Sequence, residues 1–314
     1  GALTAIFIPQ LVRSFDQEDG GDGFASRLIT TISIILFVLV AVGMYFAPAL
    51  VRLYAPEFFT TGFEVEKEIA IAFTRYCLPQ IFFLGLFTML GQVANARGSF
   101  APLMWAPIAN NIVGIALFGA FLVFSPSVSI DNISNIQVQI LGWGTTLSVV
   151  VQALILVPVI KRLGITLRPQ WGVKGLGKSF GLAGWTLIYV LISQLGYLVT
   201  VNVATSAAVR SAQEGIERGV GYTPYTFAYY VMLLPYSIVT ISIITAILPH
   251  ISRLALEKKA EEVREQLIRA IRLVGVITIP SAVAFLLFGP LITSVLFIGI
   301  PLEDSRYIGY VLAA

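Results

Sequence analysis

Charged residues are scarce in this sequence of 314 residues. Asp, Glu, Lys and Arg make up 12% of the chain and hydrophobic residues 57%, whereas soluble domains carry roughly 25% charged residues. The mean hydropathy is +0.87. A water-soluble globule of this size needs more charge to cover its surface. The composition therefore excludes a soluble enzyme and a disordered chain, and it indicates an integral membrane protein.

Residue types that build catalytic and metal sites are also few. The chain has one cysteine, Cys77, which excludes an intramolecular disulfide, and one histidine, His250. Because a metal site needs several ligands close together, we expect no bound metal. We also expect no cofactor and no nucleic-acid partner. All 17 carboxylates fall in predicted loops or at the ends of spans. Any group that couples transport to an ion therefore lies outside this sequence or uses neutral oxygens.

Long apolar runs dominate the rest of the sequence. Each of seven runs is long enough to cross a bilayer as a helix of about 20 residues. The runs are 29–51, 71–93, 103–124, 140–160, 182–209, 225–249 and 273–297. Gly1 and Ala314 lie in further apolar segments, which predicts that the sequence is part of a longer protein. We expect an all-α, polytopic membrane protein.

The distribution of Lys and Arg predicts the orientation of the spans. Of the 20 cations, 14 lie in one set of alternating loops, five lie in the opposite set and Arg75 falls inside a span. Cytoplasmic loops carry the excess of Lys and Arg. The loops around residues 20, 97, 170 and 262 are therefore predicted to be cytoplasmic.

The basic segment 252–272 has the pattern of a helix on the membrane surface. Apolar residues recur at helical spacing, and Lys258–Glu262 and Glu265–Arg269 are pairs four residues apart. Such a charge run is usually a solvated face, and a role in binding a partner is the alternative.

A weak internal repeat suggests two like halves. Pro9 and Arg13 have the same spacing as Pro249 and Arg253, and six spans separate the two pairs. An even number of spans keeps the direction of the chain, as in transporters with two parallel lobes. Chance similarity is the alternative explanation.

Polar side chains within the spans are the candidates for a transport path. Arg75 stands out because an arginine in hydrocarbon normally faces a cavity or a partner, although it could also reach the interface or bond carbonyls freed by Pro79. Many amides and phenols together favour a hydrated interior, although each alone could join two helices. The neutral set is Gln80, Gln92, Asn95, Asn110, Asn111, Gln152, Ser193, Gln194, Tyr197, Asn202, Tyr225, Tyr229, Tyr230, Tyr236 and Thr240.

The segment 172–179 matches the letters of a nucleotide-binding phosphate loop, G-x4-G-K-S. The residues before it do not form a buried strand, and no apolar run ending in Asp follows to hold magnesium. We expect no nucleotide hydrolysis. Lys174 and Lys178 are instead predicted to contact anionic lipid phosphates or to serve as ordinary cytoplasmic anchors.

Short motifs over nearly the whole chain resemble the MurJ/MviN family of lipid II flippases, within the multidrug and oligosaccharidyl-lipid exporter (MOP) superfamily. The clearest is Gly91-x3-Asn95-x4-Phe100-x-Pro102 followed by Ala106-Pro107-x3-Asn111. The start of the chain, 47–58, 193–194, 225–235, 248–249 and 280–283 also resemble family segments. The match covers about spans two to ten of roughly fourteen.

The resemblance implies a truncated, two-lobed bundle like that of the MOP and MATE exporters, with an N-terminal lobe at 1–165 and the start of a C-terminal lobe at 166–314. It also implies a transporter rather than an enzyme, in the bacterial plasma membrane. Its partners would be lipid II, membrane lipids and cell-wall synthesis proteins. The implied substrate cavity would include Arg75, Asn95, Asn111, Gln194, Tyr229 and Tyr230.

Two features leave alternatives open. Many relatives carry an acidic–basic pair and a further acid where this chain has Tyr229, Tyr230 and Leu233, so these tyrosines would bond or stack on sugars instead of binding by charge. The alternative functions are another exporter of the superfamily, for polysaccharide-lipids or drugs, and a membrane scaffold without transport activity.

Overall fold

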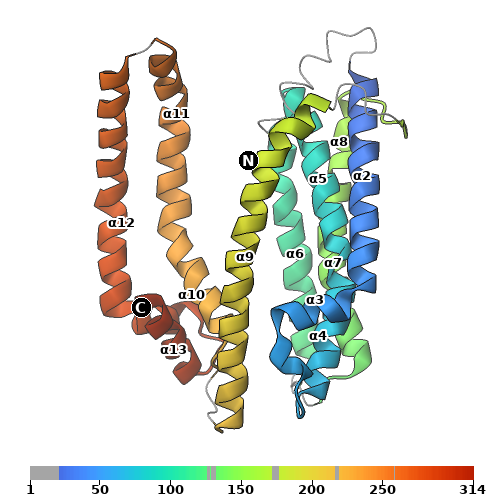
Figure 1. Cartoon of the computed structure of the whole chain (residues 1–314), viewed down its shortest axis with the longest axis vertical. Coiled ribbons are helices and arrows are strands. Elements are labelled where there is room, and N and C mark those ends of the chain that lie inside the picture. The colour runs from blue at the N-terminus through green and yellow to red at the C-terminus, as the bar shows by residue number, and fades with distance from the viewer. Residues whose placement is uncertain (1–20, 126–127, 129–131, 172–176, 216–218, 258) are drawn as a thin grey trace. The chain divides into compact units, whose positions relative to one another are not determined.

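The computed structural model describes residues 21–125, 128, 132–171, 177–215, 219–257 and 259–314. Pro9 and Arg13 of the predicted repeat lie outside these residues. Every regular element in the described residues is helical, which confirms the predicted all-α fold (Figure 1). The chain divides into two compact units, Gly1–Val199 and Thr200–Ala314. The boundary expected from the resemblance, between residues 165 and 166, stays a prediction.

The first unit is a bundle of long helices joined by short turns. Its elements are α2 (Asp22–Tyr45), α3 (Ala47–Tyr54), the 3₁₀ turn η1 (Pro56–Phe59), α4 (Glu64–Cys77), α5 (Pro79–Ala96), α6 (Ala101–Phe124), α7 (Asn135–Leu154), α8 (Leu156–Arg162) and most of α9 (Gly177–Gln213). Helix α5 packs against α2, α7 and α8, and α6 packs against α7 (Figure 1).

Proline and capping residues set several of the helix ends. Pro48 lies in the first turn of α3 and Pro79 begins α5, positions where the missing N–H of proline costs nothing. Ser134 and Gln137 form a reciprocal capping box at the start of α7. Gly21 precedes α2 with a φ of 86°, which an L side chain adopts only with strain.

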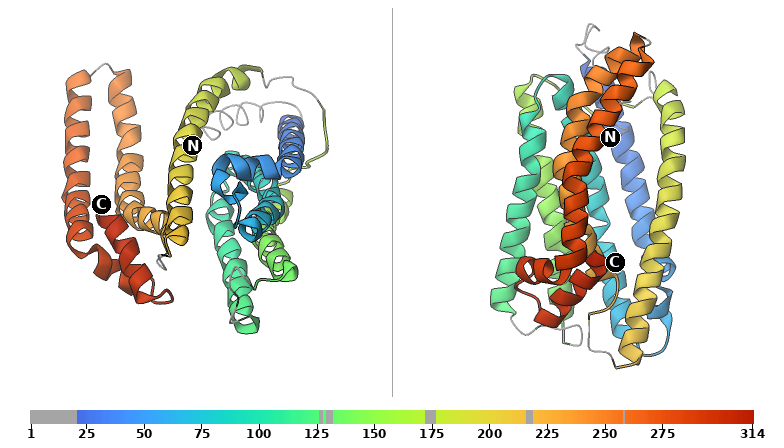
Figure 2. Two further views of the ribbon diagram at one scale, coloured as in Figure 1. Left: turned by 60° about the horizontal axis from the view of Figure 1, so that its bottom comes forward. Right: turned by 90° about the vertical axis from the view of Figure 1, so that its left-hand side faces the viewer.

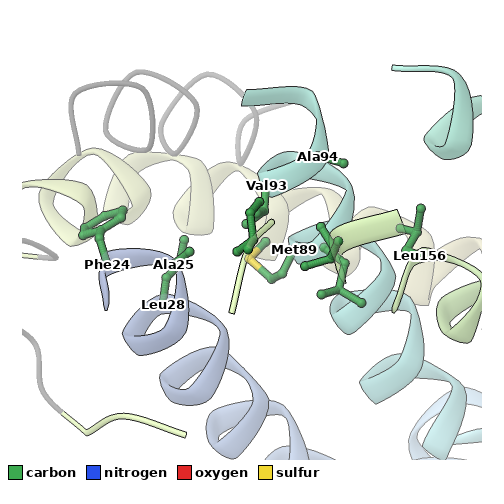
Figure 3. Close-up of a cluster of buried hydrophobic side chains, with 10 residues drawn as sticks. Phe24, Ala25, Leu28, Met89, Val93, Ala94 and Leu156 are labelled. Carbon is green, nitrogen blue, oxygen red and sulfur yellow. The ribbon is translucent and has the colours of Figure 1, made fainter. Parts of the chain in front are cut away.

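A small apolar core holds one end of this bundle together. It joins Phe24, Ala25 and Leu28 of α2 to the last two turns of α5 and to α8 (Figure 3). Val93 and Leu156 are completely buried there. Complete burial of these two side chains shows that this end of the unit is closely packed.

The second unit contains the end of α9 followed by α10 (Tyr222–Pro235), the π-helical turn η2 (Tyr236–Thr240), α11 (Ile241–Leu256), α12 (Ala260–Leu296) and α13 (Leu302–Ala313). Helices α11 and α12 run side by side (Figure 2). Helix α13 crosses α12 where Gly289 and Gly309 meet backbone to backbone. A Cβ added at Gly289 would lie 2.5 Å from the carbonyl oxygen of Gly309, so only glycine allows this approach.

Seven helices within the described residues are long and apolar enough to cross a membrane, and each overlaps one of the seven predicted runs. They are Asp22–Tyr45, Glu64–Ala96, Ala101–Phe124, Asn135–Arg162, Ile188–Gln213, Tyr222–Ile244 and Ala260–Leu296. The prediction of a polytopic helical membrane protein is confirmed.

The prediction of a single surface helix over 252–272 is wrong. This segment is divided between α11, which ends at Leu256, and α12, which begins at Ala260. Lys259 forms ion pairs with Glu257, at 3.0 Å, and Glu262, at 3.6 Å. The hydrogen bond and charge of Glu257, aided by Glu262, raise the pKa of Lys259. The predicted Glu265–Arg269 pair is present at 3.5 Å, while Lys258 lies outside the described residues.

Candidate functional site

Three predicted cavity residues of the first unit lie at different depths. Arg75 is exposed in the last turn of α4, Asn95 is half-buried in the last turns of α5, and Asn111 is exposed in the middle of α6. Twenty residues separate Arg75 from Asn95 within one span, which corresponds to about 30 Å of helix. Arg75 and Asn95 therefore cannot belong to one compact pocket.

The half-buried Asn95 shares a turn of α5 with a buried amide. Gln92 lies three residues earlier, and its side chain is 5% exposed. Neither Gln92 Oε1 nor Asn95 Oδ1 has a hydrogen-bond partner in the described part of the structure. A buried amide oxygen without a partner costs about 1–3 kcal/mol. The pair offers two acceptors to water or to a hydroxyl-bearing ligand.

Gln80, another of the predicted polar residues, joins two helices. Its Nε2 donates to Thr145 Oγ1 at 3.2 Å and to Thr146 Oγ1 at 3.3 Å on α7. Thr146 Oγ1 donates in turn to the carbonyl oxygen of Tyr76 at 2.6 Å. This network accounts for Gln80 as an interhelical contact between α5 and α7.

Gln194 lies exposed on α9, and Tyr229 and Tyr230 lie exposed on α10. The two tyrosines belong to a series on α10. The Tyr225 and Tyr229 rings are nearly parallel, with centroids 6.3 Å apart, and Tyr222 and Tyr230 continue the series with centroid distances of 6.2 and 6.3 Å. Because residues three and four apart share a helix face, Tyr222, Tyr225 and Tyr229 form a phenol surface along one face of α10, and Tyr230 lies at its edge.

A segment that the sequence analysis missed lies at the end of the first unit predicted to be cytoplasmic. Residues 165–170 run along α2, and alternate backbone N–H groups donate to α2 side chains. Thr166 N donates to Asp22 Oδ2 at 2.9 Å, Arg168 N to Ser26 Oγ at 3.2 Å and Gln170 N to Thr30 Oγ1 at 3.3 Å.

The registers of the two elements explain these three bonds. Two residues of extended chain advance about 6.6 Å, and four residues of helix advance about 6 Å. One face of α2 carries a short polar residue at every fourth position, namely Asp22, Ser26 and Thr30. Together, these three side chains therefore accept hydrogen bonds from every second N–H of the 165–170 segment. This regular spacing of short polar residues is the signal in the sequence that could have revealed the contact.

The predicted lipid contacts of Lys174 and Lys178 stay predictions. Lys174 lies outside the described residues, and Lys178 lies in the first turn of α9, where the backbone alone is described. No group of three or more His, Cys, Asp or Glu side chains that could hold a metal ion occurs among the described residues. His250 is exposed on α11.

Together, the seven apolar spans and the polar side chains within them define a multi-pass helical membrane protein. The sequence model of the family described as "Lipid II flippase MurJ" matches residues 1–314. The chain belongs to this family, and it is a multi-pass protein of the bacterial inner membrane.

Relatives and a solved structure agree with this membership. The chain is 25% identical over 305 residues to "Lipid II flippase MurJ" of Burkholderia cenocepacia, covering 95% of this chain and 55% of that protein. It is 28% identical over 138 residues to "Probable lipid II flippase MurJ" of Rickettsia prowazekii, covering 42% of this chain and 27% of that protein.

The solved structure titled "Lipid II flippase MurJ, inward closed conformation" superposes with a TM-score of 0.72 at 20% identity. It covers 100% of this chain and 60% of that chain, so the two share a fold. The chain spans about half the length of the first relatives it matches.

Proposed function

We propose that the complete protein moves lipid II, the undecaprenyl-pyrophosphate-linked peptidoglycan precursor, from the inner to the outer leaflet by alternating access. The match to the flippase family over residues 1–314 carries this proposal. The sugars, peptide and pyrophosphate of such a lipid cannot cross hydrocarbon unaided, because each polar group buried without a partner costs roughly 2–7 kcal/mol. A polar path through the protein removes this barrier.

The six predicted cavity residues supply such a path in successive steps. Asn95 and Asn111 offer amides at two depths, and Arg75 offers a positive charge for the pyrophosphate about 30 Å from Asn95 along the helix. Gln194 adds a further amide on α9. Tyr229 and Tyr230 offer phenol faces to the sugar rings. Mostly neutral contacts spread over the membrane hold the head group weakly at each position, which suits a substrate that must leave again.

The proposed reaction is transport without a covalent step, and the protein is therefore not an enzyme in this proposal. Lipid II would enter sideways with its isoprenoid tail still in the bilayer. Cell-wall synthesis proteins that make or consume lipid II are the proposed protein partners.

Replacement of Arg75 tests the proposal. In the complete protein, R75A is expected to reduce lipid II flipping at least about tenfold, because hydrogen bonds to a charged group contribute about 1.5–3 kcal/mol. Its membrane abundance should stay within twofold of the wild type. Flipping is measured in proteoliposomes and abundance by immunoblot.

Lys67 provides the matched control, since it carries the same charge near the other end of α4. K67A should leave flipping unchanged, and R75K should retain most of it. If R75A lowers abundance and flipping to the same extent, Arg75 has a structural role and the proposed contact with pyrophosphate is wrong.

A further inference from the structure

Two hollows lie beside the 165–170 segment, both within the first unit. The larger, of about 420 Å³, is lined by the apolar side chains of Leu90, Val157, Ile160, Ile165 and Leu167 together with Lys161, Gly164, Thr166 and Arg168. The smaller, of about 350 Å³, lies against α2. Leu167 and Arg168 line both hollows, so the segment passes between them.

The larger hollow combines an apolar floor with two cations. The side chains of Lys161 and Arg168 are exposed, and neither has an ion-pair or hydrogen-bond partner among the described residues. None of the described residues that line this hollow is acidic. Asp22, the acid bonded to the segment, forms an ion pair with Arg97 at 3.7 Å and accepts two hydrogen bonds from Thr166. The hollow is therefore positively charged.

The position of Arg168 is fixed by the fold. Its backbone N–H is bonded to Ser26, and the residues two before and two after it are bonded to Asp22 and Thr30. Gly164, with a φ of 73°, ends α8 and redirects the chain towards α2. Lys161 lies in the last turn of α8. The two cations thus project from anchored elements, which lowers the entropy lost when they bind a common anion.

The location of the larger hollow indicates which kind of ligand it can bind. Lys161 lies at the end of the span Asn135–Arg162, on the side that the Lys and Arg count predicts to be cytoplasmic. Basic pockets between membrane helices at this level are suited to anionic lipid head groups. A free phosphate would leave the apolar lining of the hollow without a contact, whereas an acyl chain would pack against it.

We infer that this hollow binds one anionic phospholipid, with its phosphate between Lys161 and Arg168 and an acyl chain over Leu90 and Ile160. The site is separate from the six cavity residues and does not rest on the proposed transport activity. It also differs from the contact predicted at Lys174 and Lys178.

Lipid titration of the complete, delipidated protein in detergent tests this site. Phosphatidylglycerol and phosphatidylcholine with identical acyl chains are added, and bound lipid is counted by native mass spectrometry. Phosphatidylglycerol should bind at least tenfold more tightly than phosphatidylcholine. K161Q and R168Q, which change different elements, should each weaken phosphatidylglycerol binding about fivefold, in line with the contribution of one cation near a lipid surface.

Arg162 is the matched control, because it is adjacent to Lys161 and is also exposed but does not line either hollow. R162Q should change the affinity less than twofold. Equal weakening by R162Q and R168Q would overturn the site in favour of general surface attraction, and so would equal affinity for the two lipids. Displacement by soluble glycerol phosphate would show an anion site without an acyl chain. Thermal unfolding of each variant identifies any that misfold. If either K161Q or R168Q misfolds, the binding measured with the other variant tests the site.

Discussion

Thr146 connects three helical segments through its hydroxyl group. It is 3% exposed, it accepts a hydrogen bond from Gln80 of α5, and it donates to the carbonyl oxygen of Tyr76 in α4. Helices in a bilayer gain little from the hydrophobic effect when they associate, so packing and interhelical hydrogen bonds have to hold them together. Thr146 therefore matters more for the register of α7 than its size suggests.

Removal of this hydroxyl should destabilise the protein measurably. T146V keeps the shape of the side chain and loses both bonds, and interhelical bonds contribute about 0.6–1.7 kcal/mol each. We expect a loss of about 1–2 kcal/mol, measured as a lower midpoint of thermal unfolding in detergent.

Thr278 gives the comparison for this experiment, because its hydroxyl bonds the carbonyl oxygen of Val274 in its own helix. T278V should shift the midpoint less than T146V does. An equal shift for the two variants would mean that the α5–α7 network does not contribute to stability.

At the scale of helices, the pairing of α12 and α13 depends on two glycines. Added Cβ atoms at Gly309 and Gly289 would overlap the backbone of the opposite helix. Backbone atoms cannot rotate away as the end of a long side chain can, so the helices would have to separate. Small residues at such crossings are the general means of close helix approach in membranes.

G309A is therefore expected to cost about 1–3 kcal/mol, the range for overpacking a well-packed contact. Trypsin should also cleave more readily after Arg306 as α13 loosens. Gly275 of α12 is the control, because a Cβ there meets only Ile279 Cδ1 at 3.6 Å. If G275A and G309A have the same stability and cleavage rate, the glycine crossing does not hold α13.

The sequence predicted helix existence better than helix ends. All seven spans follow from continuous apolar runs, because such runs cannot stay in water. The predicted run 29–51 extends past the end of α2 at Tyr45, since Ala47-Pro48 starts a new helix without lowering the hydropathy. The division between α11 and α12 was missed because apolar spacing and charge pairs continue across the end of one helix and the start of the next. Hydropathy indicates which residues lie in the membrane, but it does not show where a helix ends or bends.

The candidate site was less predictable than the fold. The sequence showed that three polar residues, Gln80, Asn95 and Asn111, lie within spans. It did not show which of them forms a hydrogen bond to another helix. Gln80 meets Thr145 and Thr146, a contact between residues 65 and 66 positions apart that no local pattern encodes. The contacts of the 165–170 segment join residues 140 to 144 positions apart. The spacing of Asp22, Ser26 and Thr30 marks one partner of these contacts, but the pairing with the distant segment comes from packing.

At the scale of the whole molecule, the count of Lys and Arg predicts which ends of the spans face the cytoplasm. A cysteine at the C-terminal end of α8 and a cysteine in the loop before α4 should lie on opposite sides of the membrane. In a C77S background, R162C should react with a membrane-impermeant maleimide only after the cells are opened. T61C should react in intact spheroplasts.

Thr61 and Arg162 are both exposed, so accessibility to the reagent depends on the side of the membrane. Reaction of both cysteines in intact spheroplasts, or the reverse pattern, would contradict the predicted orientation. It would also move the inferred phospholipid site to the outer leaflet.

The π-helical turn Tyr236–Thr240 bears on how this span tolerates changes of length. A π turn holds one residue more than the α turn it replaces. Loss of one residue at this point restores regular α-helix and leaves the faces of α10 and α11 in their present rotation. Loss of one residue within α10 or α11 would instead turn one half against the other by about 100°. We therefore expect that deletion of one residue within the π turn leaves the phenol surface of α10 in its present direction.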